Sequence, residues 1–143
     1  YLRQRQMCIR DRANTLLAAL PADLRAVMKP ITKYSDNTGG GNNTASYVTS
    51  TTDYLPLLSE FEYHGTRDYA NSAEQNFQQQ YAYYQAGNSK VHYKHNATGT
   101  AAGAWCRSVH AGGTSNFCRV STDGSANNRG AGGSWAVAPG FAA

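Results

Sequence analysis

Hydrophobic residues near the start of the chain recur at steps of three and four, the spacing of a helix face. Between residues 14 and 30 these positions are Leu16, Leu17, Leu20, Leu24, Val27 and Met28. Pro21 and Asp23 suit the first turn of a new helix, and Pro30 ends it. The pattern therefore predicts two short helices rather than one long helix.

The composition then changes to β-branched and aromatic residues, which favour strands. Residues 31–36 predict one strand and residues 45–58 a second. Pro56 places the second strand at a sheet edge or near its own end, because proline cannot donate to a ladder. The Gly- and Asn-rich residues 37–44 between the two predict a flexible loop.

A capping box, in which serine precedes an acidic residue by three positions, predicts a short helix at residues 59–63. Its members are Ser59 and Glu62. Glu60 and Glu62 are two positions apart and do not face each other on a helix, so they are not the paired carboxylates of a hydrolase. We expect a structural role, in which one of them pairs with the Arg107 guanidinium beneath the loops.

A second capping box, Ser72 with Gln75, predicts a helix over residues 72–86 that Gly87 terminates. One face of this helix would carry Ala73, Phe77, Tyr81 and Tyr84. A stripe of this kind is typical of a packed interior, so we expect these side chains in the core.

The C-terminal third contains three strand candidates, of which residues 104–109 and 116–122 predict an antiparallel hairpin. In a symmetric register the opposed pairs are Trp105 and Arg119, Cys106 and Cys118, and Arg107 and Phe117. We expect a structural role for Trp105. Two interpretations of Cys106 and Cys118 stay open, a cross-strand disulfide and two small buried thiols.

The third strand candidate, residues 134–141, alternates bulky with small side chains. The bulky members, which would form one buried face, are Trp135, Val137 and Phe141. The polar loop that precedes this strand is then anchored at both ends. Loops held in this way on a scaffold commonly carry binding residues.

We define the loop face as a set of polar and aromatic residues on or beside loops 109–116 and 121–134. Its members are His110, Thr114, Asn116, Arg119, Ser121, Asn127, Asn128, Arg129, Ser134 and Trp135. Mixtures of Ser, Gly and Asn with a few Arg and aromatic residues are typical of adaptable recognition surfaces. The loop face is therefore the candidate ligand-binding surface.

The formal net charge is +4, but residues 1–12 hold four arginines against one aspartate and leave about +1 on residues 13–143. The remaining basic residues are scattered, whereas a nucleic-acid-binding surface clusters them. No window has the apolar length of a membrane-spanning helix. We therefore expect neither a nucleic-acid partner nor membrane insertion.

Candidate metal ligands are sparse. His92 and His95 are three positions apart on an extended segment, so their rings would point to opposite faces. We expect both, together with His64 and His110, at the surface. An Asp-Gly turn between strands explains Asp123 without a calcium ion. The sequence thus predicts no metal and no cofactor.

Residues 1–12, YLRQRQMCIRDR, resemble the translated remnant of a sequencing adapter and lack the apolar segment of a signal peptide. We expect a non-native or disordered segment here, followed by one domain over residues 13–143. Any true upstream sequence, including a signal peptide, would then be missing from this fragment.

Four segments resemble those of an uncharacterised bacterial and phage domain family: LPLLSEFEY (55–63), WCRS (105–108), FCRVSTDGSAN (117–127) and WAVAPGF (135–141). Members of that family carry Trp-Trp-Leu-Arg-Ser and Gly-Val-Ala-Pro-Gly-Phe near their C-termini, and the resemblance extends over residues 13–143. More distantly, the first segment is similar to the Leu-Pro-Thr-Glu-Ala-Glu-Trp-Glu-Tyr stretch of formylglycine-generating-enzyme-like proteins.

The resemblance implies an α+β, C-type-lectin-like fold, with short N-terminal helices packed on a small, loop-rich antiparallel sheet. Ala104 and Cys106 stand where the family pattern has Trp and Leu. Replacing a buried Trp by Ala costs roughly 3–5 kcal/mol unless neighbouring side chains fill the space. We expect compensation around these positions or a less stable domain.

The family is uncharacterised, so the resemblance carries no activity over. Our first hypothesis is a non-catalytic adhesion or recognition module of a longer bacterial surface or phage protein. It would be secreted, on the cell surface or on a virion, and would bind a glycan or protein through the loop face. The alternatives are an inert spacer and a formylglycine-generating-enzyme-like domain that uses Cys106 and Cys118. No nucleophile–base set accompanies these cysteines, so we do not expect an enzyme.

Overall fold

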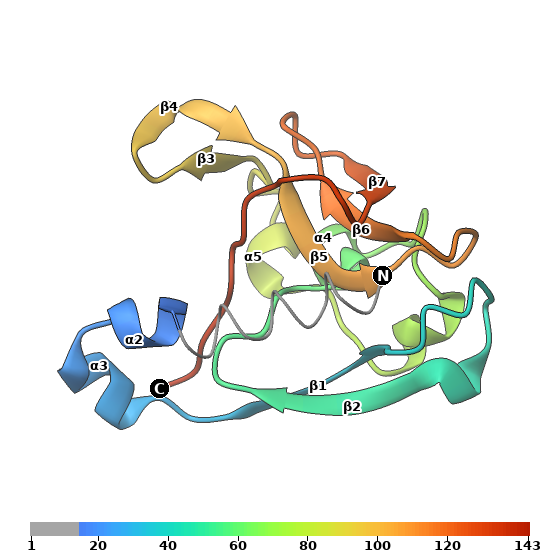
Figure 1. The fold of residues 1–143 in the computed structure, drawn as a ribbon, viewed down its shortest axis with the longest axis horizontal. Helices are drawn as coiled ribbons and strands as arrows, with labels where there is room; N and C mark the ends of the chain where they lie inside the picture. Colours follow the sequence, from blue (N-terminus) through green and yellow to red (C-terminus); the bar gives the residue numbers. More distant parts are fainter. Residues whose placement is uncertain (1–14) are drawn as a thin grey trace.

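The computed structural model describes residues 15–143, and the predictions for residues 1–12 lie outside this range. Its first elements are two short helices, α2 (Leu17–Ala19) and α3 (Ala22–Val27) (Figure 1). Pro21 precedes α3, and its carbonyl accepts the N–H of Arg25 at 3.0 Å. Because proline has no N–H to continue the preceding turn, the helix breaks there, which confirms the prediction.

Strands β1 (Ile31–Asp36) and β2 (Val48–Asp53) pair as an antiparallel ribbon along the lower edge of Figure 1. The first strand has the predicted bounds, and the second is shorter than predicted. The segment before β2 forms a 3-10 turn, η2 (Ala45–Tyr47). After β2, the side chain of Asp53 accepts the N–H of Leu55 at 3.1 Å, which turns the chain away from the ribbon.

Helix α4 (Glu60–His64) begins with the predicted capping box. The Oγ of Ser59 accepts a hydrogen bond from the N–H of Glu62 at 3.0 Å, and the Oε2 of Glu62 accepts one from the N–H of Ser59 at 3.0 Å. Gly65 ends the helix in the left-handed region, at φ 70°, where a side chain would be strained.

The single helix predicted over residues 72–86 is wrong. The segment forms a 3-10 helix, η3 (Ser72–Asn76), and a separate one-turn helix, α5 (Ala82–Gln85). The predicted second capping box is also wrong, because the side chain of Asn71 caps η3 by accepting the N–H of Ala73 at 2.9 Å.

Tertiary hydrogen bonds explain this interruption. The side-chain amide of Gln78 donates to the carbonyl of Tyr34 at 2.7 Å, and the N–H of Tyr81 donates to the carbonyl of Glu62 at 3.1 Å. These bonds to other elements take the place of a continuous helix. Phe77 is 51% exposed and Tyr81 is 40% exposed. The prediction that both rings lie in the core is therefore wrong.

Three antiparallel strands form the main sheet in the order β5 (Ala104–Val109), β6 (Asn116–Val120) and β7 (Ala126–Gly130). The third strand lies inside the predicted loop 121–134, so that part of the prediction is wrong. Its sequence, ANNRG, has no β-branched residue, and local propensity therefore gives no signal. Pairing with β6 along its whole length makes it a strand.

Residues 134–141 do not form the predicted strand. Val137 and Phe141 are 38% and 52% exposed, so the bulky face is not buried. The segment instead makes isolated bridges, which join Ala136 to Ala104 of the edge strand β5 and Pro139 to Leu57.

The register of the β5–β6 hairpin is partly as predicted. Trp105 lies opposite Arg119, but the register then shifts, and Val109 rather than Arg107 lies opposite Phe117. The two cysteines of the hairpin are free thiols, and both are buried.

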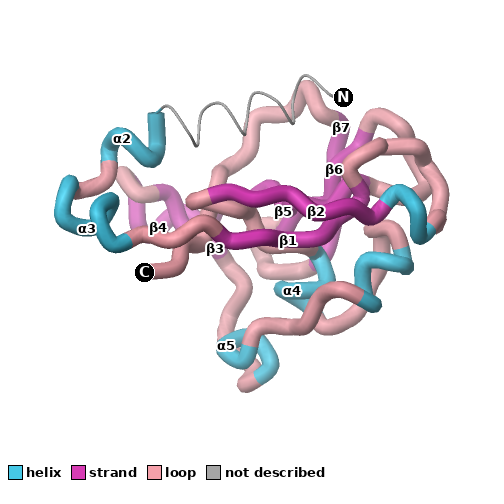
Figure 2. Tube along the Cα trace, turned by 90° about the horizontal axis from the view of Figure 1, so that it is seen from below, coloured by secondary structure: helices cyan, strands magenta, loops and turns pink. Residues whose placement is uncertain are grey.

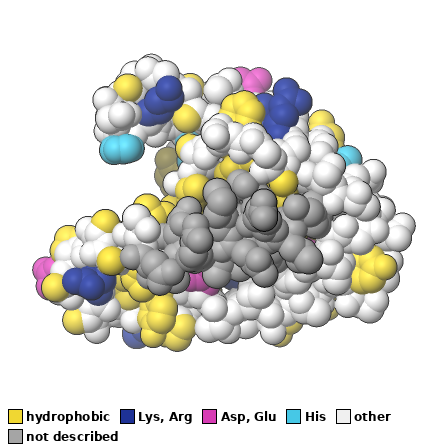
Figure 3. Space-filling view, in the orientation of Figure 1, with side chains coloured by type: hydrophobic (Ala, Val, Ile, Leu, Met, Phe, Trp, Pro, Cys, Tyr) yellow, Lys and Arg dark blue, Asp and Glu magenta, His cyan; other side chains and the backbone are white. Residues whose placement is uncertain are grey.

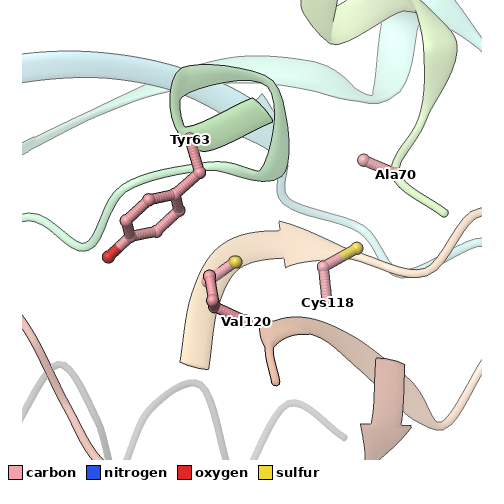
Figure 4. Close-up of a cluster of buried hydrophobic side chains, with 5 residues drawn as sticks. Tyr63, Ala70, Cys118 and Val120 are labelled. Atoms are coloured by element: carbon pink, nitrogen blue, oxygen red, sulfur yellow. The ribbon is translucent and has the colours of Figure 1, made fainter. Parts of the chain in front are cut away.

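Two hydrophobic clusters lie against the sheet. The first joins α4 to β5 and β6 and comprises Tyr63, Ala70, Cys106, Cys118 and Val120 (Figure 4). The second has Ala131 and Trp135 packed against it and comprises Leu57, Trp105, Val109 and Phe117. Because side chains alternate along a strand, neighbouring positions of β6 contribute to different clusters.

A separate hairpin of β3 (His92–Lys94) and β4 (Ala97–Ala102) projects from the body (Figures 1 and 3). Elsewhere the strands run through the middle of the molecule with short helices around them (Figure 2). This mixture of short helices and small antiparallel sheets confirms the predicted α+β class. Among residues 15–143, no helix has the length and apolar character needed to cross a membrane.

Candidate functional site

The sheet divides the loop face between its two sides. Directly opposed residues of neighbouring strands share a face. Arg119 lies opposite both Trp105 and Asn127, and Arg129 lies opposite Phe117, so these side chains share one face. Arg119 therefore lies in a strand, as predicted, whereas Asn127 and Arg129 belong to strand β7 rather than to the predicted loop.

Other members of the loop face lie apart from this group. On the opposite side of the sheet, the Nδ2 of Asn116 donates to the Oδ1 of Asn128 at 2.8 Å. His110 is half buried, not at the surface as predicted, because its ring packs edge-on against Tyr69 with centroids 5.6 Å apart. Thr114 and Ser134 are exposed to solvent, as is Arg129 of the first group.

Arg119 is a largely buried cation whose Nε has no hydrogen-bonding partner among residues 15–143. Its relative exposure is 6%, and its Cζ lies 3.9 Å from the centroid of the Trp135 ring. The Nε is fully buried, and no group among residues 15–143 hydrogen-bonds to this guanidinium. Burial, together with the nearby charge of Arg129, lowers the pKa of Arg119. An unpaired buried N–H is costly, so the Nε is suited to an acceptor from outside the described residues. The two Nη groups are not among the fully buried unpaired atoms and can donate to the same acceptor.

Gly103 leaves the space in which Arg119 and Trp135 stack. A Cβ at this position would lie 2.6 Å from the Nη1 of Arg119 and 3.0 Å from the Cε3 of Trp135. The indole Nε1 of Trp135 is also buried without a partner among the described residues. The stacked pair therefore offers two kinds of N–H donor for which residues 15–143 supply no acceptor.

Replacing Gly103 by alanine is expected to displace the Arg119 guanidinium from the indole and to cost about 1–3 kcal/mol, as overpacking does. Urea unfolding and tryptophan emission measure the two effects. Gly99→Ala on β4 is the matched control, because a Cβ there meets no atom within 4 Å. Unchanged stability and emission in Gly103→Ala would contradict the stacked arrangement.

Polar side chains of the β6–β7 hairpin already hydrogen-bond to one another. The Nδ2 of Asn127 donates to the Oγ of Ser121 at 3.0 Å, and Ser121 is buried rather than exposed on a loop. In the turn between β6 and β7, the Oδ1 of Asp123 accepts the hydroxyl and the N–H of Ser125, which lowers the pKa of Asp123. The carboxylate of Asp123 therefore stabilises the turn between β6 and β7.

Glu62 is the carboxylate that pairs with Arg107. Its two oxygens accept the Nη1 and Nη2 of Arg107 at 3.1 and 3.2 Å, and one of them accepts the Nζ of Lys33 at 2.9 Å. Burial alone would raise the pKa of Glu62, but Arg107, the N–H of Ser59 and Lys33 together lower it. A bidentate fork of this kind holds both side chains in one orientation.

Glu60 and Glu74 are buried acids with structural partners. The carboxylate of Glu60 accepts the backbone N–H groups of residues 68–70 at 2.8–3.1 Å and so ties this loop to α4. The sequence interpretation missed Glu74, which accepts the N–H of Asp36 at 2.7 Å and the hydroxyl of Ser108 at 2.8 Å. Burial raises its pKa. The sequence gives no sign of this burial, because Glu74 lies outside the apolar face of the helix predicted over residues 72–86.

The surroundings of Cys106, Cys118 and the half-buried histidines bear on the catalytic alternative. Burial, with the negative charge of Glu60, raises the pKa values of Cys106 and Cys118 well above the ordinary value, which disfavours the nucleophilic thiolate. His92 is half buried, not at the surface as predicted, because its Nε2 lies 3.1 Å from the hydroxyl of Tyr63. In the described part of the chain, no group of three His, Cys, Asp or Glu side chains is placed to hold a metal.

Stability is expected to fall on mild acidification because two histidines are half buried. Burial lowers the pKa of His92, and burial together with the charge of Lys90 lowers the pKa of His64. His64 is therefore half buried, not at the surface as predicted. The ordinary pKa of histidine is 6.5. The unfolded chain then binds more protons than the folded chain, so stability is full above this pH and declines as the pH falls through it.

Urea unfolding at about pH 7.5 and pH 5.5 checks this expectation. The midpoint should be lower at the acidic pH, and the variant His64→Gln/His92→Gln should reduce the difference. An equal difference in the variant would assign the acid sensitivity to other groups.

Comparison with protein-family models identifies a match over residues 13–142 to the family described as Domain of unknown function (DUF6273). No curated protein and no solved structure matches the chain. The family match fits the resemblance to an uncharacterised domain family, and it assigns no activity to the residues described above.

Proposed function

The chain belongs to the family described as Domain of unknown function (DUF6273), and we propose that it is a non-catalytic recognition module of a larger bacterial surface or phage protein. In this proposal it binds a glycan or protein on a cell surface. The contact is an acidic group of the ligand, received by Arg119 and Arg129 beside Trp135, which together we call the basic site. The observation that carries the proposal is the largely buried Arg119, whose Nε has no hydrogen-bonding partner among the described residues.

The chemistry of the basic site supports an anionic ligand group. A planar guanidinium matches a carboxylate, sulfate or phosphate through two parallel hydrogen bonds. Stacking on Trp135 holds the guanidinium plane and excludes water from one side, which strengthens its attraction for an anion. The exposed Arg129 adds a second positive charge nearby. Each charge-assisted hydrogen bond contributes about 1.5–3 kcal/mol.

We extend the proposal to the fold type and the location: a C-type-lectin-like domain that is secreted, surface-displayed or part of a virion. The short helices around small antiparallel sheets, and the capping box within the LPLLSEFEY segment, support this fold type. The formylglycine-generating-enzyme-like alternative has less support, because both thiols are buried and their pKa values are raised. The spacer alternative also has less support, because a spacer binds no ligand and would leave the Nε of Arg119 without an acceptor.

Binding of the 143-residue chain to an array of acidic and neutral glycans and cell-wall polymers tests the proposed function. We expect acidic members to bind and Arg119→Met to abolish that binding. Arg25→Ala, which removes an exposed arginine from α3, is the matched charge control and should bind like the unaltered chain. Equal binding by Arg119→Met would place the site elsewhere. No binding by the folded chain would favour the spacer.

A further inference from the structure

A second candidate site is an open groove of about 500 Å³ between β1 and residues 77–85. This volume lies within the range of roughly 300–1,000 Å³ that ligand sites occupy. Its lining side chains come from β1, α4 and residues 77–85, and none belongs to the basic site. We call this feature the aromatic groove.

Exposed aromatic rings line the aromatic groove. Tyr34 and Phe77 stack with their centroids 5.2 Å apart and 18° between the ring planes, although they are 40% and 51% exposed. Stacking covers only the inner ring faces, so each ring still presents apolar surface to solvent. Single exposed apolar side chains are ordinary, but a fixed pair in the wall of a polar groove indicates a ligand with an apolar face.

The amide side chains of the groove divide into fixed and free groups. Gln78 and Gln80 donate to main-chain carbonyls of β1 and α4, at 2.7 and 3.0 Å, and hold the segment in place. The side-chain amides of Gln79 and Gln85 are exposed and make no hydrogen bond with the described residues. Each of these two free amides therefore offers both donors and an acceptor.

The charged side chains that line the groove are paired, in contrast to the basic site. The Nζ of Lys33 donates to the Oε1 of Glu62 at 2.9 Å and to the hydroxyl of Tyr81 at 2.7 Å. The third N–H of the ammonium and the hydroxyl proton of Tyr81 remain available to a ligand. Lys33 and Glu62 are the charged residues of the lining, and each has a partner of opposite charge. The groove therefore offers no unpaired charge to an anion and suits a neutral, hydrogen-bonding ligand.

We propose that the aromatic groove binds a neutral saccharide. The apolar face of a sugar ring packs on Tyr34 and Phe77, and its hydroxyl groups exchange hydrogen bonds with the free amides, Lys33 and Tyr81. This inference goes beyond the proposed function, because it concerns a separate surface and an uncharged ligand, and it stands without the basic site.

Titration of the full chain with neutral chito- and malto-oligosaccharides, followed by calorimetry, tests this proposal. We expect binding that Phe77→Ala weakens at least about tenfold. Tyr93→Ala is the matched control, because Tyr93 is 57% exposed on the projecting hairpin and lies outside the groove. Arg119→Met should bind these saccharides normally, so failure of the basic site would not hide a result here.

Three results would overturn the proposal: no binding of any neutral oligosaccharide by the folded chain, equal weakening by Phe77→Ala and Tyr93→Ala, or displacement of the bound sugar by acidic glycans in a manner that Arg119→Met abolishes. A groove that takes a tyrosine-rich peptide but no saccharide would also overturn it.

Discussion

Replacing Glu62 by alanine is expected to lower the free energy of unfolding by about 3–5 kcal/mol. The change leaves the Arg107 guanidinium, whose side chain is 8% exposed, without its carboxylate. It also removes the acceptor for the N–H of Ser59 in the capping box and for Lys33. Losing one partner of a buried ion pair is costly because the remaining charge cannot be resolvated.

Urea unfolding measures this loss, with Asp68→Ala as the control. Asp68 is an exposed carboxylate in the loop after α4, and its removal should change stability by less than about 0.5 kcal/mol. The double variant Glu62→Leu/Arg107→Met should recover much of the loss, because apolar residues often replace a buried ion pair without penalty. A loss under about 1 kcal/mol in Glu62→Ala would show that water reaches the pair.

Replacing Arg119 by methionine is expected to stabilise the chain by about 1–3 kcal/mol, the cost of an unpaired buried polar group. Methionine keeps the packing against Trp135 and removes the charge. Binding of an acidic ligand should weaken by roughly 10²–10⁴-fold, because two charge-assisted hydrogen bonds are lost. A gain in stability with a loss of binding is typical of a residue retained for its ligand.

Parallel unfolding and binding measurements on Arg119→Met and Arg25→Met separate this effect from the general removal of a charge. The control should change neither quantity appreciably. If Arg119→Met were destabilised and bound the acidic ligand normally, the guanidinium would be a structural group.

The elements that the sequence predicts well depend on local signals. Pro21 breaks the first helix by lacking an N–H, and Ser59 with Glu62 satisfies the free N–H groups at the start of α4. The elements predicted wrongly depend on distant partners. The backbone N–H of Tyr81 donates to the carbonyl of Glu62 instead of to a carbonyl of its own helix, and β7 is a strand because β6 lies beside it.

The candidate site follows the same division. The hairpin pattern places Arg119 opposite Trp105, and the structure has this pair. The burial of Arg119 depends on the position of Trp135 in the C-terminal segment. No local sequence pattern predicts the path of that segment. The sequence does not predict the aromatic groove for a related reason. Helical periodicity assigns Phe77 and Tyr81 to the core, whereas both are exposed because residues 72–86 do not form one helix.

The most direct test of the basic site is the side-chain N–H signal of Arg119 in the ¹H–¹⁵N NMR spectrum, assigned by its absence in Arg119→Met. We expect this signal to shift as an acidic oligosaccharide is added and to stay unchanged with a neutral one. Saturable binding of the acidic ligand without any change in the Arg119 signal would contradict the basic site.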